Sequence, residues 1–135
     1  MNMTQRTITD AQLKEVVKLI VGQQGIITLD AEDVRYVLYG KSGMLYSAQQ
    51  GEEGYQEFMK TTFKELSEKT FVKDCQYMLL SIGMSREEPM TMDDMNIIHD
   101  FFGEFTNDRM EMKWGLNINR KGERMTIYVI CTNDH

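Results

Sequence analysis

The apolar run at residues 75–82 restricts the possible folds more than any other stretch of this 135-residue chain. It has the length of a strand, and its polar residues are Gln76 and Ser81. Successive side chains of a strand point to opposite faces of the sheet, so this run is apolar on both faces. Such a strand is typical of the interior of a sheet that other elements cover. The run therefore predicts a domain built of helices and a sheet.

Three segments have the apolar spacing of amphipathic helices. The first begins at a capping box formed by Thr9 and Gln12 and is expected to end before Gly25. The second covers residues 53–69, and its apolar stripe consists of Tyr55, Phe58, Met59, Thr62, Phe63 and Leu66. The third begins at the cap Thr91, and its apolar stripe consists of Met95, Ile98, Phe102 and Phe105.

Further strands are expected on either side of these helices. A short strand is expected at residues 44–48, after the glycine-containing residues 40–43 interrupt the regular structure. Residues 111–119 alternate between apolar and polar side chains, which indicates a strand with one wet face. Residues 119–123 contain a glycine suited to a hairpin, so residues 124–131 are expected to return as an antiparallel neighbour. The order of elements predicts an α+β fold. We expect a two-layer domain with a mixed four-stranded sheet, helices packed on one face, and a preceding N-terminal helix.

Two carboxylates stand three residues apart where an apolar run gives way to helical spacing. Asp30 is in the position of an N-cap, and Asp33 is in the third helical position, where it would complete a capping box. At the start of a helix this spacing places both acids on one face, near the unpaired N–H groups of the first turn. The residues alone therefore predict a capped helix that begins after Asp30.

The string at residues 25–37 also resembles the synergy loop of FtsZ, the bacterial relative of tubulin. The family pattern is roughly Gly-Leu-Ile-Asn-Val-Asp-Phe-Ala-Asp-Val-Arg-Thr-Val, and the matching residues are Gly25, Ile27, Asp30, Asp33, Val34, Arg35 and Val37. In that family the two aspartates reach into the nucleotide site of the next subunit of a filament. Three more stretches, 44–52, 75–83 and the pair 111–119 and 124–132, are similar to strands of the family's C-terminal domain.

The resemblance extends from about Thr9 to Thr132 and covers the C-terminal domain only. It implies a single domain over residues 1–135, in which residues 9–24 are the end of the core helix, 25–33 the synergy-loop-like segment and 34–135 the α+β domain. No glycine-rich loop replaces the family's nucleotide-binding half, because residues 40–43 lack the Walker spacing. The family's usual Asn and Phe are replaced by Thr28 and Ala31.

These features together suggest a non-catalytic protein-interaction module. By resemblance it would dock on or regulate FtsZ- or tubulin-like filaments in cell division, with an FtsZ-like GTPase or a second copy as partner. The partner interface would consist of Thr28, Asp30, Asp33 and Arg35. At most, the two aspartates would assist GTP hydrolysis in a partner subunit.

Composition and motifs argue against several other functions. The net charge is −6 and the basic residues are scattered, which argues against binding of nucleic acid or of an anionic membrane. The absence of a signal peptide and of a long apolar run predicts a cytoplasmic protein. Cys75 and Cys131 lie in strand-like runs and are expected to be buried free thiols. His99 is expected on a helix surface, and no residue set has the spacing of a metal or cofactor site.

Two alternative interpretations stay open. The chain could be an oligomeric α+β domain that binds a small molecule or is an enzyme. Its pocket would then lie between subunits, near the wet face of residues 111–119 and the aromatic residues Tyr46, Tyr77, Trp114 and Tyr128. The chain could also be a fragment or remnant of an FtsZ-like GTPase.

Overall fold

A computed structural model describes residues 3–21, 25–104 and 110–134. Within these ranges, six strands form one sheet: β1 (Met3–Thr9), β2 (Gly25–Ile27), β3 (Lys41–Gln49), β4 (Tyr77–Met84), β5 (Glu111–Ile118) and β6 (Thr126–Asp134). The helices are a short 3-10 turn (Asp10–Gln12), α1 (Leu13–Ile20), α2 (Ala31–Leu38), α3 (Tyr55–Glu68), α4 (Thr70–Asp74) and α5 (Met92–Gly103).

The sheet has the strand order β1-β3-β6-β4-β5-β2. Strands β4 and β5 are parallel, and every other neighbouring pair is antiparallel, so the sheet is mixed. The predicted α+β class with a mixed sheet is therefore confirmed, but the sheet has six strands and not four. The two additional strands, β1 and β2, form its edges. Local sequence signals for both are weak, because β2 is only three residues long and β1 is mostly exposed.

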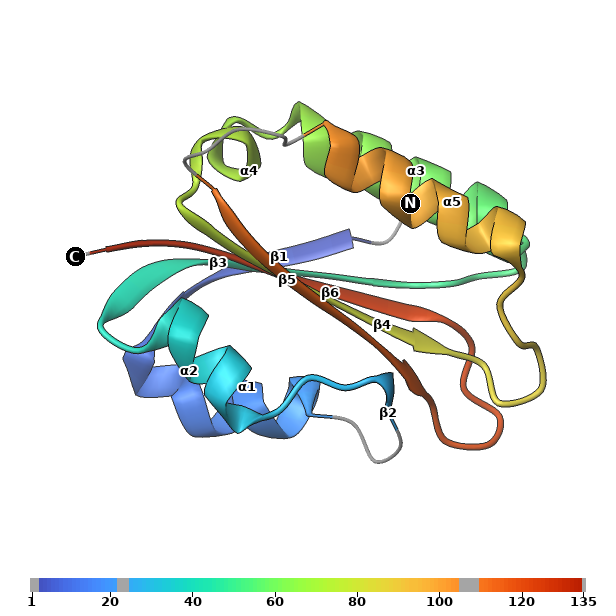
Figure 1. Ribbon diagram of the computed structural model, residues 1–135, viewed down its shortest axis with the longest axis horizontal. Coiled ribbons are helices and arrows are strands. Elements are labelled where there is room, and N and C mark those ends of the chain that lie inside the picture. Colours follow the sequence, from blue (N-terminus) through green and yellow to red (C-terminus); the bar gives the residue numbers. More distant parts are fainter. Residues whose placement is uncertain (1–2, 22–24, 105–109, 135) are drawn as a thin grey trace.

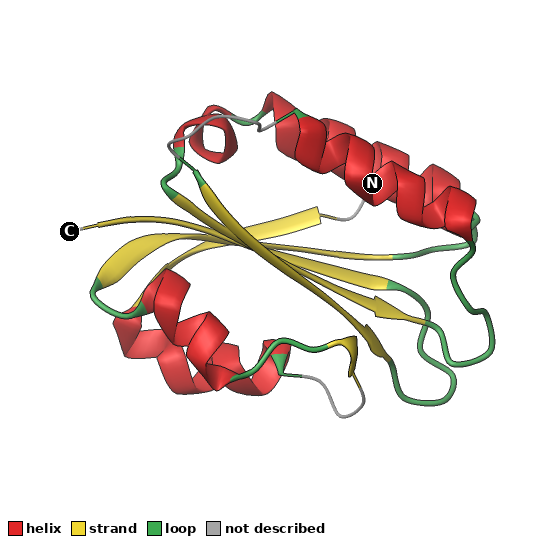
Figure 2. Cartoon of the chain, in the orientation of Figure 1, coloured by secondary structure: helices red, strands yellow, loops and turns green. Residues whose placement is uncertain are grey.

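Helices cover the sheet in two groups (Figures 1 and 2). Helices α3, α4 and α5 lie together on one face, as predicted for the two longest of them. Helices α1 and α2 pack on the opposite face. They form a third layer in addition to the two layers that were expected. This arrangement explains why the run at residues 75–82 is apolar on both faces.

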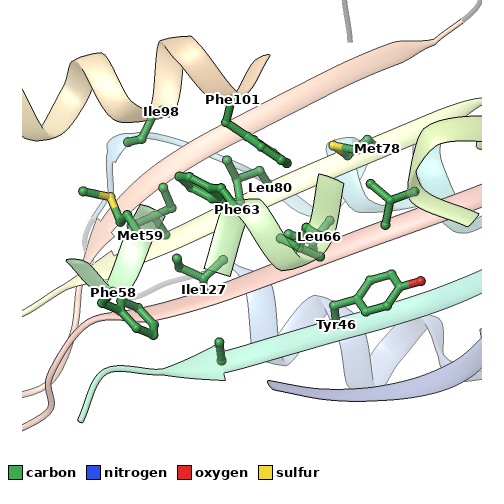
Figure 3. Close-up of a cluster of buried hydrophobic side chains, with 14 of the residues drawn as sticks. Tyr46, Phe58, Met59, Phe63, Leu66, Met78, Leu80, Ile98, Phe101 and Ile127 are labelled. Atoms are coloured by element: carbon green, nitrogen blue, oxygen red, sulfur yellow. The ribbon is translucent and has the colours of Figure 1, made fainter. Parts of the chain in front are cut away.

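The larger core lies between helices α3 and α5 and the four strands β3, β4, β5 and β6 (Figure 3). All six residues of the stripe predicted for α3 are buried. Phe63 stacks on Phe101 with the ring centroids 4.4 Å apart. Helix α5 begins at the predicted cap, because Thr91 and Asp94 form a capping box. In the predicted α5 stripe Ile98 is buried, while Phe105 lies outside the described residues.

The smaller core joins the opposite face of the sheet to helices α1 and α2. From the central strands it receives Leu79 and Ile130, both fully buried. From α2 it receives three fully buried residues, Val34, Val37 and Leu38. Thr132 of β6 also donates a hydrogen bond to the carbonyl of Val37. Helix α2 is thus fixed to the centre of the sheet, and its N-terminus is held in place.

The predicted hairpin between the last two strands is wrong. Strand β4 lies between β5 and β6, so the chain crosses the end of β4 after β5. Asn119 stabilises this crossing, since its Nδ2 donates to the carbonyls of Gly83 and Arg124. A Cβ at Gly83 would come 2.1 Å from Asn119 Oδ1, so the crossing requires glycine there. The glycine of the connection, Gly122, does have a left-handed backbone, with φ of 88°.

The predicted first helix is shorter than expected. Thr9 and Gln12 form the predicted capping box, but they cap a 3-10 turn that leads into α1. Helix α1 ends at Ile20, and residues 22–24 lie outside the described residues. The strand predicted at residues 44–48 is longer than expected, because residues 41–43 also pair with β6. A Cβ at Gly43 would come 1.9 Å from the carbonyl oxygen of Cys131, so glycine allows this close approach.

Candidate functional site

The first turn of α2 has the capping box that the spacing of its acids predicts. Asp30 is the N-cap, and its Oδ1 accepts a hydrogen bond of 3.0 Å from the backbone N–H of Asp33. Asp33 Oδ2 accepts a reciprocal bond of 3.0 Å from the backbone N–H of Asp30. Two N–H groups at the start of the helix are satisfied in this way. The geometry therefore presents Asp30 on an exposed, rigid helix end.

The two aspartates differ in their surroundings. Lys113 of β5 extends its Nζ to within 3.0 Å of Asp33 Oδ1 and forms an ion pair with it. Burial opposes ionisation of Asp33, but the hydrogen bond from Asp30 and the Lys113 ammonium together lower its pKa. Asp33 is thus charged and already paired within the molecule. Asp30 is exposed, so it is the aspartate available to a partner.

The other two predicted interface residues are also exposed. Thr28 is exposed in the loop before α2, and Arg35 is exposed on the helix itself. The Arg35 guanidinium lies 3.8 Å from a carboxylate oxygen of Glu32 and 5.1 Å from the ring centroid of Tyr39. The four residues thus lie in the loop before α2 and on the first part of that helix, where Asp30 and Asp33 bond to each other and Thr28, Asp30 and Arg35 are exposed.

Three large side chains of β2, of α2 and of its C-terminal end are also exposed. Ile26 is 53% exposed, and Tyr39 is 61% exposed. Tyr36 is 44% exposed and lies edge-on to Tyr77, with the ring centroids 5.7 Å apart. Exposed aromatic residues are frequent at the centre of protein interfaces. We call the exposed surface formed by Ile26, Thr28, Asp30, Arg35, Tyr36 and Tyr39 the α2 surface.

Three charged side chains contact Tyr36 and orient it. Its hydroxyl donates a hydrogen bond to the carboxylate of Glu111. The ammonium nitrogens of Lys113 and Lys41 lie 5.1 and 5.8 Å from its ring centroid. The bond to Glu111 is the main reason why the pKa of Tyr36 is raised to about 12. These contacts hold an exposed aromatic ring in one orientation, which reduces the entropy lost on binding a partner.

Strand β5 determines where the loop before α2 lies. A Cβ at Gly115 would come 2.5 Å from Leu29 Cγ and 2.7 Å from the carbonyl oxygen of Ile27. The loop can therefore lie directly on β5 only because position 115 is glycine. Sequence reasoning missed Lys113, Tyr36 and Gly115. Lys113 and Tyr36 could have been noticed, because each is a charged or aromatic residue at an outward-facing position of its strand or helix.

A cavity of about 560 Å³ lies on the same face of the sheet, between the end of α1 and the crossing of β5 to β6. Its lining is mostly polar and includes Lys18, Ser81, Asn117, Asn119, Arg124 and Tyr128. A smaller cavity of about 110 Å³ adjoins it and shares Val21, Ser81 and Asn117. Asn117 Oδ1 is buried there, and no donor among the described residues reaches it.

Only one of the four aromatic residues expected at a pocket lines the larger cavity. That residue is Tyr128. Tyr46 is buried in the larger core, Trp114 packs near Phe102, and Tyr77 contacts Tyr36. Within the described ranges, no helix is long and apolar enough to span a membrane. The same ranges hold no cluster of His, Cys, Asp and Glu side chains suited to a metal ion, and His99 is exposed on α5.

Comparison with known proteins identifies similar folds but no sequence relative. No protein family and no curated protein matches the chain. Its fold is similar to TubZ of Bacillus thuringiensis serovar israelensis in GDP-form protofilaments, with a TM-score of 0.62 and 16% identity, over 92% of this chain and 37% of that one. The empty FtsZ dimer of M. jannaschii gives a TM-score of 0.60 and 12% identity, over 90% and 36% of the two chains.

The chain therefore spans little more than a third of the length of these structures. At this level of identity the likeness concerns the fold alone, which is similar to part of the TubZ and FtsZ structures.

Proposed function

We propose that this chain is the counterpart of the C-terminal domain of FtsZ and TubZ and acts as a non-catalytic interaction module. Its α2 surface docks on a subunit of an FtsZ- or TubZ-like filament and regulates that filament, in cell division. The observation that carries the proposal is the exposed, capped start of α2 at Asp30, together with exposed Ile26 before the helix and exposed Tyr39 at its C-terminal end. The similarity to chains solved as protofilaments and as a dimer supports it.

The pairing of Asp33 supports a docking role over a catalytic one. A carboxylate that activates water must be free to accept a proton or a hydrogen bond from it. Asp33 is already bonded to the Asp30 N–H and to Lys113. Asp30 is free to contact a partner, but one exposed carboxylate on a helix end is a recognition element and not a catalytic set.

The polarity of such filaments determines the consequence of docking. A head-to-tail contact is heterologous and continues only if each subunit offers two different surfaces. This chain matches about a third of a TubZ or FtsZ subunit. A module that offers only the α2 surface adds to one end of a filament and stops further growth there.

The test is co-sedimentation with a purified FtsZ-type or TubZ-type GTPase polymerised with GTP, together with GTP turnover and filament length. We expect the wild-type chain to pellet with the filaments and to shorten them. Asp30→Ser keeps the capping oxygen but removes the charge, and it should weaken binding on the order of tenfold. The matched control is Asp93→Ser, which removes an exposed acid from the first turn of α5, on the opposite helical layer.

Unchanged filament length and unchanged GTP turnover at saturating wild-type chain would overturn the proposal. Equal binding by wild type and Asp30→Ser would show that the α2 surface is not the contact. An increase in the GTP turnover of the partner that Asp30→Ser abolishes would contradict the non-catalytic role.

The polar cavity supports a second candidate function, the binding of a small molecule. Its volume of about 560 Å³ is within the usual range for ligand pockets. Asn117 Oδ1 has no donor within the described ranges, and the lining contains more basic residues (Lys18, Arg120 and Arg124) than acidic ones (Glu123), which favours a ligand that has both a donor and an anionic group. Thermal unfolding with a panel of carboxylate and phosphate metabolites tests this function. Stabilisation by one compound that is lost in Ser81→Val would support it, and no stabilisation by any compound would reject it.

A further inference from the structure

Strand β1 lies at one edge of the sheet, and within the described ranges no strand pairs with its outer side. It pairs with β3 over seven residues, from Met3 to Thr9, without a shift in register. The strand at the other edge, β2, has three residues and a shift in register. Proteins often shorten or distort their edge strands, because a regular edge is ready to pair with another chain. The β1 edge has neither protection.

The side chains of β1 leave this edge open. The four residues in its middle are exposed, namely Thr4, Gln5, Arg6 and Thr7. They point alternately to the two faces of the sheet, so no described helix covers this part of the strand. The single charge, Arg6, is turned toward α1, where its Nη2 lies 2.5 Å from a carboxylate oxygen of Glu15. A second chain can therefore reach β1 without displacing a packed element.

A hydrogen bond at Thr9 indicates which backbone groups of β1 face outward. In an antiparallel pair each residue directs its N–H and C=O to one side of the strand, and the side alternates along the chain. The Thr9 N–H donates to Oε1 of Gln12 at 2.7 Å, so it does not point toward β3. By this alternation the N–H and C=O groups of Met3, Gln5 and Thr7 also face outward.

The pairing of β3 with β6 leads to the same result. Just after β3, the Gln50 N–H donates to the Met125 carbonyl at 2.9 Å, so the even-numbered residues of β3 face β6 and the odd-numbered ones face β1. Those odd-numbered residues lie opposite the even-numbered residues of β1. The odd-numbered residues of β1 therefore face away from the sheet.

We propose that β1 pairs with β1 of a second copy of this chain, antiparallel about a two-fold axis at Gln5, so that the two sheets join into one. In this register Gln5 lies opposite its own counterpart and Met3 lies opposite Thr7, and all three are outward-facing residues. Each such pair exchanges two main-chain hydrogen bonds, which gives about six across the contact. Thr4 lies opposite Arg6, so no like charges are directly opposed.

The neighbouring symmetric registers fit less well. An axis at Arg6 would place two guanidinium groups opposite each other, which destabilises a strand pair. An axis at Thr7 would pair Gln5 with Thr9, whose N–H is already bonded to Gln12. The strand is thus complementary to itself in one register, as an isologous contact requires, and this favours a second copy over an unrelated strand.

The contact is small, so the dimer is weak, with a Kd on the order of 10 to 100 μM. Strand β1 lies at the edge opposite β2, and β2 leads into the loop before α2. Pairing through β1 therefore leaves both α2 surfaces exposed. One consequence rests on the proposed function: a dimer whose two α2 surfaces dock on filaments holds two filament ends together.

The experiment measures the oligomeric state of the whole chain by sedimentation velocity, from about 5 μM to about 1 mM. We expect the dimer fraction to rise over this range. Gln5→Lys places two ammonium groups opposite each other, so it should weaken the dimer about fivefold at low salt and less at high salt. Asn96→Lys makes the same amide-to-lysine change at an exposed position of α5, and it should leave the dimer unchanged.

A dilution series followed by amide NMR locates the contact. The signals of residues 3–7 should move on dilution, and those of the α2 surface should not. A chain that stays monomeric at about 1 mM, equal weakening by Gln5→Lys and Asn96→Lys, or shifts confined to the α2 surface would each overturn the proposal. The NMR series needs only the wild-type chain. Gln5→Lys should still bind filaments as a monomer, so failure of the dimer and failure of filament docking are separate results.

Discussion

Replacing Asp30 tests whether the start of α2 is held as the structure indicates. In Asp30→Ala the backbone N–H of Asp33 loses its acceptor, Asp30 Oδ1, which now lies 3.0 Å away. Loss of an N-cap costs about 1 kcal/mol. The buried residues Val34, Val37 and Leu38 attach α2 to the sheet, so the loss should lower the stability of the whole chain and not unfold the helix alone.

The magnitude can be measured by urea unfolding. With an m-value of about 2 kcal/mol per molar urea, the loss of about 1 kcal/mol lowers the midpoint by about 0.5 M. The expected fall in melting temperature is about 3 °C. Asp30→Ser is the matched control. Serine caps as well as aspartate, so its midpoint should stay within about 0.2 M of wild type.

Two results would refute this reasoning. If Asp30→Ala unfolds at the wild-type midpoint, the bond to the Asp33 N–H contributes nothing. If Asp30→Ser is as unstable as Asp30→Ala, then the negative charge of Asp30 stabilises the chain, and the hydrogen bond from the Asp33 N–H does not. Repeating the series at high salt separates these cases, because salt screens the charge effect and leaves the hydrogen bond.

Three further predictions concern the surroundings of α2. Gly115→Ala should cost about 1–3 kcal/mol by urea unfolding, since the new Cβ would come 2.7 Å from the Ile27 carbonyl; a smaller loss would mean that the loop does not lie on β5. Leu79→Ala should cost about 2–5 kcal/mol, because Leu79 is fully buried beneath α2; a loss under 1 kcal/mol would contradict this. Lys113→Met should cost about 0.5 kcal/mol at pH 6, and the cost should disappear in acid. The folded-state pKa of Asp33 is lowered, so its contribution is present above its ordinary value of 3.8 and is lost as the pH falls through the folded-state pKa; a cost that does not decrease as the pH falls below 3.8 would contradict the ion pair.

The features that could be predicted from the sequence depend on neighbours along the chain. The buried stripe of α3, the caps Thr91 and Asp30, and the left-handed Gly122 each follow from residues within a few positions of one another. Hydrogen bonds at helix ends and the helical repeat involve residues close together in the sequence, so they can be predicted without knowing the strand order.

The strand order could not be predicted in this way. The connection after β5 has the signals of a hairpin, but such signals do not distinguish pairing with the next strand from crossing over a third strand. A contrary signal was available, because α5 separates β4 from β5, and a strand, a helix and a strand in succession favour a parallel pair. The strand order matters for the site, because Lys113 of β5 lies beside Asp33, 80 positions away in the sequence.

The contact between Lys113 and Asp33 also determines which substitution is informative. A sequence motif treats Asp30 and Asp33 alike, so the natural test would remove both. In the structure, removing Asp33 would break the capping box, leave the Lys113 ammonium without its carboxylate, and change the surroundings of Tyr36. A loss of partner binding would then reflect a disturbed surface as readily as a lost contact. Asp30→Ser changes one exposed charge and keeps the helix cap, so a loss of binding in that variant can be assigned to the carboxylate itself.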